Sequence, residues 1–135
     1  MNKNKKEIVN KMGDTPVSSF MNEDYVKLKA NYSIKGTIEI FRTHHIGGAP
    51  VTDFQEKIIG VISDYDLLIQ AASKPLTSNI EFKEKIFSVY PESTLKEVLV
   101  ILYKQKLKWM PVINEHGFMQ GTITRIDVLH FIANH

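Results

Sequence analysis

The chain has 135 residues, of which 43% are hydrophobic and 24% are charged, a balance typical of a folded globular protein. The net charge of +2 gives no reason to expect nucleic-acid binding, and the lack of cysteine excludes disulfides and thiolate metal sites. No apolar run approaches the roughly 20 residues of a membrane-spanning helix, and the N-terminus lacks the apolar core of a signal peptide. We therefore expect a cytoplasmic protein with no membrane partner and no room for a separate catalytic domain.

Residues 1–16 form a predicted N-terminal extension. Its basic cluster is interpreted as a solvated chain end, with an interaction arm as the alternative, and consists of Lys3, Lys5 and Lys6. A weak apolar edge indicates a short helix and consists of Ile8, Val9 and Met12.

The first predicted structural unit covers residues 17–73. A short apolar stretch at residues 25–28 is typical of a strand, and Ile34, Ile38 and Phe41 then share one face of a helix. Two further strands, 50–52 and 58–63, flank a polar turn and predict a hairpin. A second helix is expected over residues 64–72. Residues 74–85 contain Pro75, Ser78 and Asn79 without a sustained apolar period, and are predicted to be a linker.

The second predicted unit, residues 86–135, has the same order of elements. A strand is expected at 86–89, and Thr94 with Glu97 forms a capping box at the start of the next helix. Strands at 110–113 and 118–124 flank a turn in which Gly117 can adopt a positive φ. A last helix is expected over residues 125–133.

The two units are copies of one another at a constant offset of 61 residues, with no gap. The matching pairs include Pro50 and Pro111, Gly60 and Gly121, Ser63 and Thr124, and Asp66 and Asp127. Neither copy has enough apolar residues to form a comfortable core alone, so each is expected to cover the other's sheet. The predicted fold class is α+β, with two β-α-β-β-α repeats related by a pseudo-twofold axis.

The repeated signature is a strand with Pro-Val, a turn, and then Gly-x-x-Ser/Thr-x-x-Asp at the start of a helix. It resembles the CBS domain, and two copies in one chain resemble a Bateman module. The resemblance covers roughly residues 15–135. It implies a site for an adenosine-containing ligand, such as AMP, ADP, ATP or S-adenosylmethionine, in clefts between the repeats.

Residue roles follow from the same resemblance. Asp66 and Asp127 would hold ribose hydroxyls, while Ser63 and Thr124 would face phosphate. The segments that would receive the base comprise Ile46, Gly47, Gly48, Ala49 and Pro50 in the first repeat, and Leu107, Lys108, Trp109, Met110 and Pro111 in the second. The chemistry is sound on general grounds, because a carboxylate can accept two hydroxyl hydrogen bonds and a helix N-terminus favours an anion.

Each signal also has a simpler interpretation. The Ser/Thr-x-x-Asp pattern is a helix cap, and both roles remain open for Asp66 and Asp127. Arg125 is unfavourable at a helix start, which indicates either an anionic ligand or an ion pair at the rim. The first repeat has Asp64 at this position. We therefore favour the second repeat, with help from Lys106 or Lys108, for a charged phosphate tail.

Three further features leave alternatives open. His44 and His45 are interpreted as surface or interface residues and not as metal ligands. Gly47-Gly48 either lets a base approach the backbone or only ends a helix. Trp109 stacks on a base, lines a dimer surface or packs on a neighbouring helix.

The function predicted from the sequence is non-catalytic sensing of an adenine nucleotide by a homodimer. No cofactor is required, and an unidentified protein partner would read the ligand-bound state. The alternative is a structural or dimerisation module with degenerate, unoccupied clefts. An enzyme is not expected, since the sequence offers no nucleophile–base pair, metal cluster or glycine-rich phosphate loop.

Overall fold

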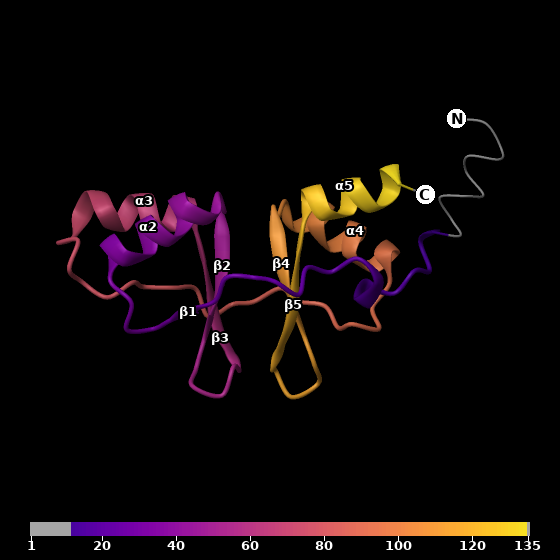
Figure 1. Cartoon of the computed structure of the whole chain (residues 1–135), viewed down its shortest axis with the longest axis horizontal. Coiled ribbons are helices and arrows are strands. Elements are labelled where there is room, and N and C mark those ends of the chain that lie inside the picture. Colours follow the sequence, from indigo (N-terminus) through magenta and orange to yellow (C-terminus); the bar gives the residue numbers. More distant parts are fainter. Residues whose placement is uncertain (1–11, 135) are drawn as a thin grey trace. The chain divides into compact units, whose positions relative to one another are not determined.

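The computed structural model of the chain describes residues 12–134 (Figure 1), so the predicted basic cluster and most of the N-terminal helix lie outside the described residues. The described chain divides into two compact units. The first-repeat unit consists of residues 25–86 and 116–119. The second-repeat unit consists of residues 12–24, 87–115 and 120–134.

The first-repeat unit has a three-stranded sheet beside two helices that contact each other. In chain order its elements are β1 (Leu28–Lys29), α2 (Ile34–His44), β2 (Gly48–Thr52), β3 (Ile58–Ser63) and α3 (Asp64–Ser73). Strand β2 lies in the centre, parallel to β1 and antiparallel to β3. The core is apolar, and its fully buried members include Leu28, Ile34, Ala49, Val51 and Ile62.

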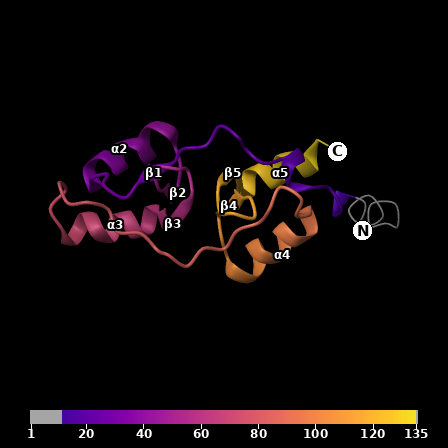
Figure 2. The same cartoon turned by 90° about the horizontal axis from the view of Figure 1, so that it is seen from below.

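The second-repeat unit begins with a short 3-10 helix, η1 (Val17–Ser19). It continues with α4 (Leu95–Gln105), β4 (Trp109–Ile113), β5 (Met119–Thr124) and α5 (Arg125–Ala133). Strands β4 and β5 form a two-stranded sheet (Figure 2). The buried core includes Val17, Val98, Met110, Val112 and Ile123.

The helices and hairpins agree closely with the sequence predictions, and Gly117 has the predicted positive φ of 86°. The two leading strands are shorter than predicted. Strand β1 has two residues, and the expected strand at 86–89 is reduced to one parallel bridge between Val89 and Val112. Each pairing is brief because the chain turns at once, with Tyr32 N donating to Lys29 O at 3.1 Å and Ser93 N to Tyr90 O at 3.0 Å.

The second strand of each hairpin also pairs with a segment from outside its own repeat. Asn22 and Thr122 exchange backbone hydrogen bonds of 2.8 and 2.9 Å, and Val61 and Lys83 exchange two bonds of 2.9 Å. The first pair lies wholly in the second-repeat unit, and the second pair lies wholly in the first-repeat unit. Residues 17–22 therefore pack with the second repeat, and residues 76–83 of the predicted linker pack with the first.

A buried glutamine holds the linker in place. The amide of Gln70 in α3 donates to Glu81 O at 2.9 Å and accepts from Glu81 N at 2.8 Å. Ile80, one residue earlier, is 4% exposed and belongs to the first-repeat core. The linker is thus a structural part of that unit and more than a tether.

Candidate functional site

Both helices that follow the hairpins begin with a capping box. In α3, Asp66 N donates to Ser63 Oγ at 3.1 Å and Ser63 N donates to Asp66 Oδ2 at 3.2 Å. In α5, the matching distances for Thr124 and Asp127 are 3.0 and 2.9 Å. The capping interpretation of both motifs is therefore confirmed. Each aspartate uses one oxygen for the cap, which leaves its second oxygen for another partner.

The segment before each Pro-Val strand is tied directly to the same helix start. Asp64 N donates to Gly47 O at 2.8 Å, and Arg125 N donates to Lys108 O at 3.0 Å. The predicted base-side segments and the predicted phosphate-side residues therefore lie together within each unit. Because these contacts recur 61 residues apart, they belong to the repeat itself and not to a local accident of packing.

Burial limits what the base-side residues can offer a ligand. The side chains of Ala49 and Met110 are 0% and 1% exposed, so only their backbone atoms could contact a bound molecule. Pro50 and Pro111 are also buried. The partly exposed members are Ile46, Gly47, Gly48, Leu107 and Trp109, and Lys108 is exposed. A base would therefore meet backbone polar groups flanked by apolar side chains, as in many small-molecule sites.

Gly47-Gly48 does not end helix α2. The helix ends at His45, which has a left-handed φ of 52°, and the matching residue Lys106 ends α4 with a φ of 53°. Among the described glycines only Gly117 has a positive φ. The strain at His45 is offset by a closing hydrogen bond from Ile46 N to Phe41 O at 3.1 Å. A Cβ at Gly47 would lie 3.2 Å from Asp64 Oδ2, so this glycine leaves room for that carboxylate.

The two sites differ in the freedom of their aspartates. Asp66 Oδ1 lies 3.4 Å from Lys83 Nζ, whereas Asp127 has no ion pair within the described part of the chain. The side chain of Asp66 is 18% exposed, which marks it as partly shielded. A ribose would have to compete with Lys83 at the first site but not at the second.

The two sites also differ in charge. Arg125 Nε donates to Leu107 O at 2.7 Å, which holds the guanidinium beside the base-side segment. Over residues 12–134, Arg125, Lys106 and Lys108 form no ion pair with an acidic side chain. The rim ion pair considered for Arg125 is therefore not found among the described residues. The second site thus presents cations where the first presents Asp64.

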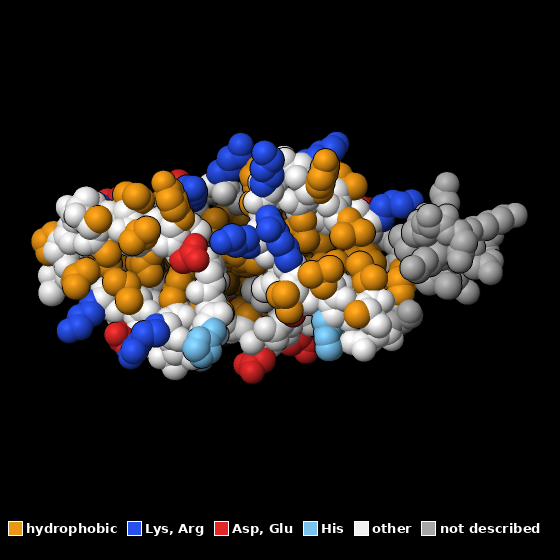
Figure 3. All heavy atoms as spheres, turned by 90° about the horizontal axis from the view of Figure 1, so that it is seen from above, with side chains coloured by type: hydrophobic (Ala, Val, Ile, Leu, Met, Phe, Trp, Pro, Cys, Tyr) orange, Lys and Arg blue, Asp and Glu red, His pale blue; other side chains and the backbone are white. Residues whose placement is uncertain are grey.

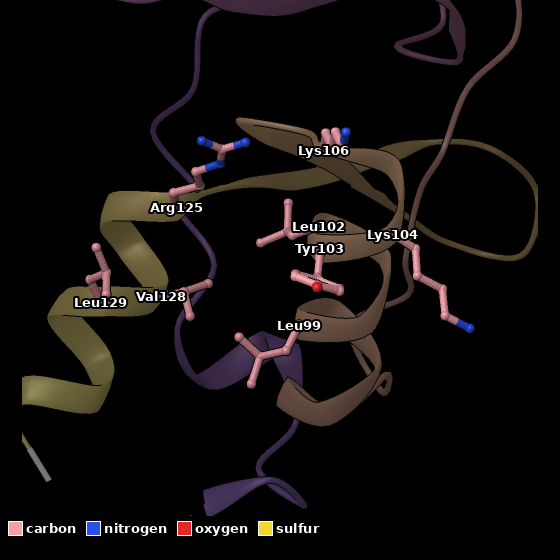
Figure 4. Close-up of a pocket in the computed structure, with 8 residues that line it drawn as sticks. All are labelled: Leu99, Leu102, Tyr103, Lys104, Lys106, Arg125, Val128 and Leu129. Carbon is pink, nitrogen blue, oxygen red and sulfur yellow. The ribbon is translucent and has the colours of Figure 1, made fainter.

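Each unit also has an open groove between its two helices that the sequence analysis did not identify. In the second-repeat unit the groove between α4 and α5 has a volume of about 590 Å³, and Lys106 and Arg125 lie at one end of it (Figure 4). Its apolar wall consists of Leu99, Leu102, Val128 and Leu129. The matching groove between α2 and α3 has a volume of about 380 Å³ and includes Asp64, Ile38, Phe41, Leu67 and Leu68. Hydrophobic side chains are visible on the helices of both units (Figure 3).

The histidine pair does not gather other metal ligands. Across residues 12–134, no group of three or more His, Cys, Asp or Glu side chains is placed to hold a metal ion. In the same range, no helix is both long and apolar enough to cross a membrane.

The comparisons with known proteins identify the family. The profile of the CBS domain matches residues 17–72 and again residues 79–134, which together cover most of the chain. The fold and the duplicated site are those of a CBS domain pair, and the chain belongs to the CBS domain family.

Similar proteins include both enzymes and isolated domain pairs. Inosine-5'-monophosphate dehydrogenase of Halalkalibacterium halodurans is 31% identical over 85 residues, which is 63% of this chain but only 18% of that enzyme. The chain thus spans about a fifth of the length of the first dehydrogenase relatives. A CBS domain pair solved with 5'-methylthioadenosine and S-adenosyl-L-methionine superposes with a TM-score of 0.79 at 20% identity, covering 89% of this chain and 97% of that one. The protein CBSX2 in complex with AMP gives 0.80 at 24% identity, with coverages of 88% and 96%.

Proposed function

We propose that this chain is a non-catalytic sensor that binds an adenosine-containing nucleotide at the start of α5. The observation that carries the proposal is the state of Asp127. One of its oxygens holds the helix cap, and the carboxylate has no ion pair among the described residues, beside a backbone segment that can receive a base. The adenosine ligands of the similar domain pairs support this choice of ligand class.

The ligand favoured by the second site carries phosphate. Arg125, Lys106 and Lys108 form no ion pair with an acidic side chain over residues 12–134, and the helix start adds a partial positive charge. Anions at a helix start are typically favoured by about 0.3–1 kcal/mol when exposed. The first site, with Asp64 at the matching position and Lys83 beside Asp66, would take a less charged ligand or remain empty.

The proposed sensor works as a homodimer that contacts through the exposed apolar faces of its helices. Eight of the twelve large hydrophobic side chains that are exposed in the described chain lie on α3, α4 and α5. Occupancy of the site would shift the arrangement of the repeats, and a protein partner would respond to that shift. We also retain the cytoplasmic location as a prediction.

Isothermal titration calorimetry with AMP, ADP, ATP, S-adenosylmethionine and adenosine tests the proposal. We expect binding of at least one phosphate-bearing nucleotide, and a loss of about 1–3 kcal/mol in binding free energy for Asp127→Ala, because a ribose hydroxyl would lose its buried partner. Asp66→Ala should have a smaller effect on the same titration.

The matched control is Glu97→Ala. Glu97 forms the same capping box with Thr94 at the start of α4, so its loss reproduces the capping defect without removing a proposed ligand contact. Equal losses of affinity for the two variants would remove Asp127 from the site. If no adenine ligand binds and the dimer remains intact, the structural-module alternative holds instead.

A further inference from the structure

The helix faces of the two repeats have matching apolar patterns. Tyr65 and Leu68 on α3 are 68% and 63% exposed, and the residues 61 positions later, Ile126 and Leu129 on α5, are 72% and 61% exposed. Both Leu68 and Leu129 line the groove of their own unit. Judged by apolar area alone, either face could therefore pair with a copy of itself or with the other face.

Charge separates the two faces. The groove of the first repeat has Asp64 at the start of α3, and the groove of the second repeat has Arg125 at the matching position of α5. Lys106 adds a second cation at the same end, where the first repeat has His45 (Figure 4). Arg42, the other charged residue lining the first groove, already pairs with Glu39 at 3.1 Å on its own helix. Within residues 12–134, neither Asp64 nor Arg125 has an ion pair.

Pairing of like faces would place Asp64 near Asp64 and Arg125 near Arg125 of a second copy. Like charges at the core of an interface are strongly disfavoured, whereas opposed charges favour association and select the orientation. Pairing of unlike faces would oppose Asp64 of each copy to Arg125 of the other. A closed dimer with twofold symmetry makes this contact twice.

We propose that this chain forms a head-to-tail homodimer, in which the α2–α3 face of each copy lies on the α4–α5 face of the other. This inference rests on the proposed homodimer and specifies its orientation. It commits to a second copy as the occupant of both grooves, since each groove supplies the charge that the other lacks.

The first test uses the lack of cysteine in the chain. Leu68→Cys and Leu129→Cys chains, one of them carrying a mass tag, are refolded together and treated with a flexible bis-maleimide. We expect a crosslink between the two different variants and little crosslinking of either variant alone. Phe54→Cys, at a turn position that is 97% exposed and away from both grooves, serves as the control. Crosslinking within each single variant would overturn the orientation but keep the dimer, and a purely monomeric protein would overturn both.

The second test exchanges the charges and measures the dimer dissociation constant by sedimentation without added nucleotide. Asp64→Arg and Arg125→Asp should each weaken the dimer by roughly tenfold, because each makes two attractive contacts repulsive. The double variant D64R/R125D should return to within about threefold of the native value, since it restores both opposed pairs. Circular dichroism checks that each variant is folded. Single variants that dimerise like the native protein, or a double variant no better than the singles, would overturn the proposal.

Discussion

At the scale of single residues, Asp66 and Asp127 show how one side chain can serve both the fold and a ligand. Each caps its helix through Oδ2, so the carboxylate is held in place before any ligand arrives. A carboxylate has about four acceptor positions, and the cap uses only one of them. The choice between cap and ligand residue that the sequence left open is therefore not a real conflict. What the sequence could not show is that Lys83 approaches Asp66 alone, because that contact depends on the path of the linker.

The repeated glycines Gly60 and Gly121 have a structural reason that was hidden in the sequence. A Cβ at Gly60 would lie 2.2 Å from a ring atom of Phe82 and 2.7 Å from Lys83 O. A Cβ at Gly121 would lie 2.9 Å from Asn22 O. The duplication marked both positions as important, but the neighbours come from segments outside the repeat and leave no local pattern.

Gly60→Ala should therefore destabilise the protein. We expect the free energy of unfolding to fall by about 1–3 kcal/mol, because a backbone carbonyl and a ring must both move. Urea denaturation followed by circular dichroism measures the change. Gly36→Ala in α2 is the control, since its Cβ would meet only the Ser33 hydroxyl at 3.1 Å and alanine favours a helix. A Gly60 variant as stable as the control would show that the crossing segment does not pack as described.

At the scale of the elements, the helices were predictable because each carries its own signals. Thr94 with Glu97 fixed the start of α4, and the apolar period fixed its buried face. The leading strands were not predictable in length, because their pairing depends on which backbone they meet. Residues 86–89 had the composition of a strand but make a single bridge, at Val89.

An ion pair connects the approach to β1 with the turn between β2 and β3. Lys27 Nζ lies 2.7 Å from Glu56 Oε2, and Lys29 Nζ lies 3.6 Å from Oε1. The hydrogen bond from Lys27 lowers the pKa of the Glu56 carboxyl below its usual value, and the same bond raises the pKa of Lys27. Both shifts favour the folded state in the range where both groups are charged.

Glu56→Gln should lower the free energy of unfolding by less than about 1 kcal/mol at neutral pH, because the pair is partly exposed. The folded-state pKa of Glu56 is depressed, so its contribution is present above the unfolded-state pKa and is lost as the pH falls through the folded-state value. The difference between native and variant protein should therefore vanish in acid. Chemical denaturation at several pH values measures it. A difference that persists below the carboxyl range would assign the effect to packing and not to charge.

At the scale of the whole molecule, the duplication explains the fold, but the repeat is not the unit that packs. The family profile begins at residues 17 and 79, whereas residues 12–24 group with the second-repeat unit. Val17 is fully buried in that unit, and Ile80 is buried in the other. Each core therefore needs apolar residues that precede the opposite repeat. The offset of 61 residues revealed the copies but not this exchange, since the exchanged segments are short and carry few apolar residues.

This exchange predicts that the second repeat cannot fold well by itself. A fragment of residues 86–135 lacks Val17 and the backbone partner of Thr122, so its sheet edge and part of its core would be exposed to water. We expect poor dispersion in its proton–nitrogen NMR spectrum. An excess of a peptide of residues 12–24 should restore dispersion by binding the folded form. The same peptide with Val17→Asp should fail, because it would bury an unpaired charge. A fragment that is fully folded without the peptide would show that each repeat is self-sufficient and that the exchanged segment is only an accessory.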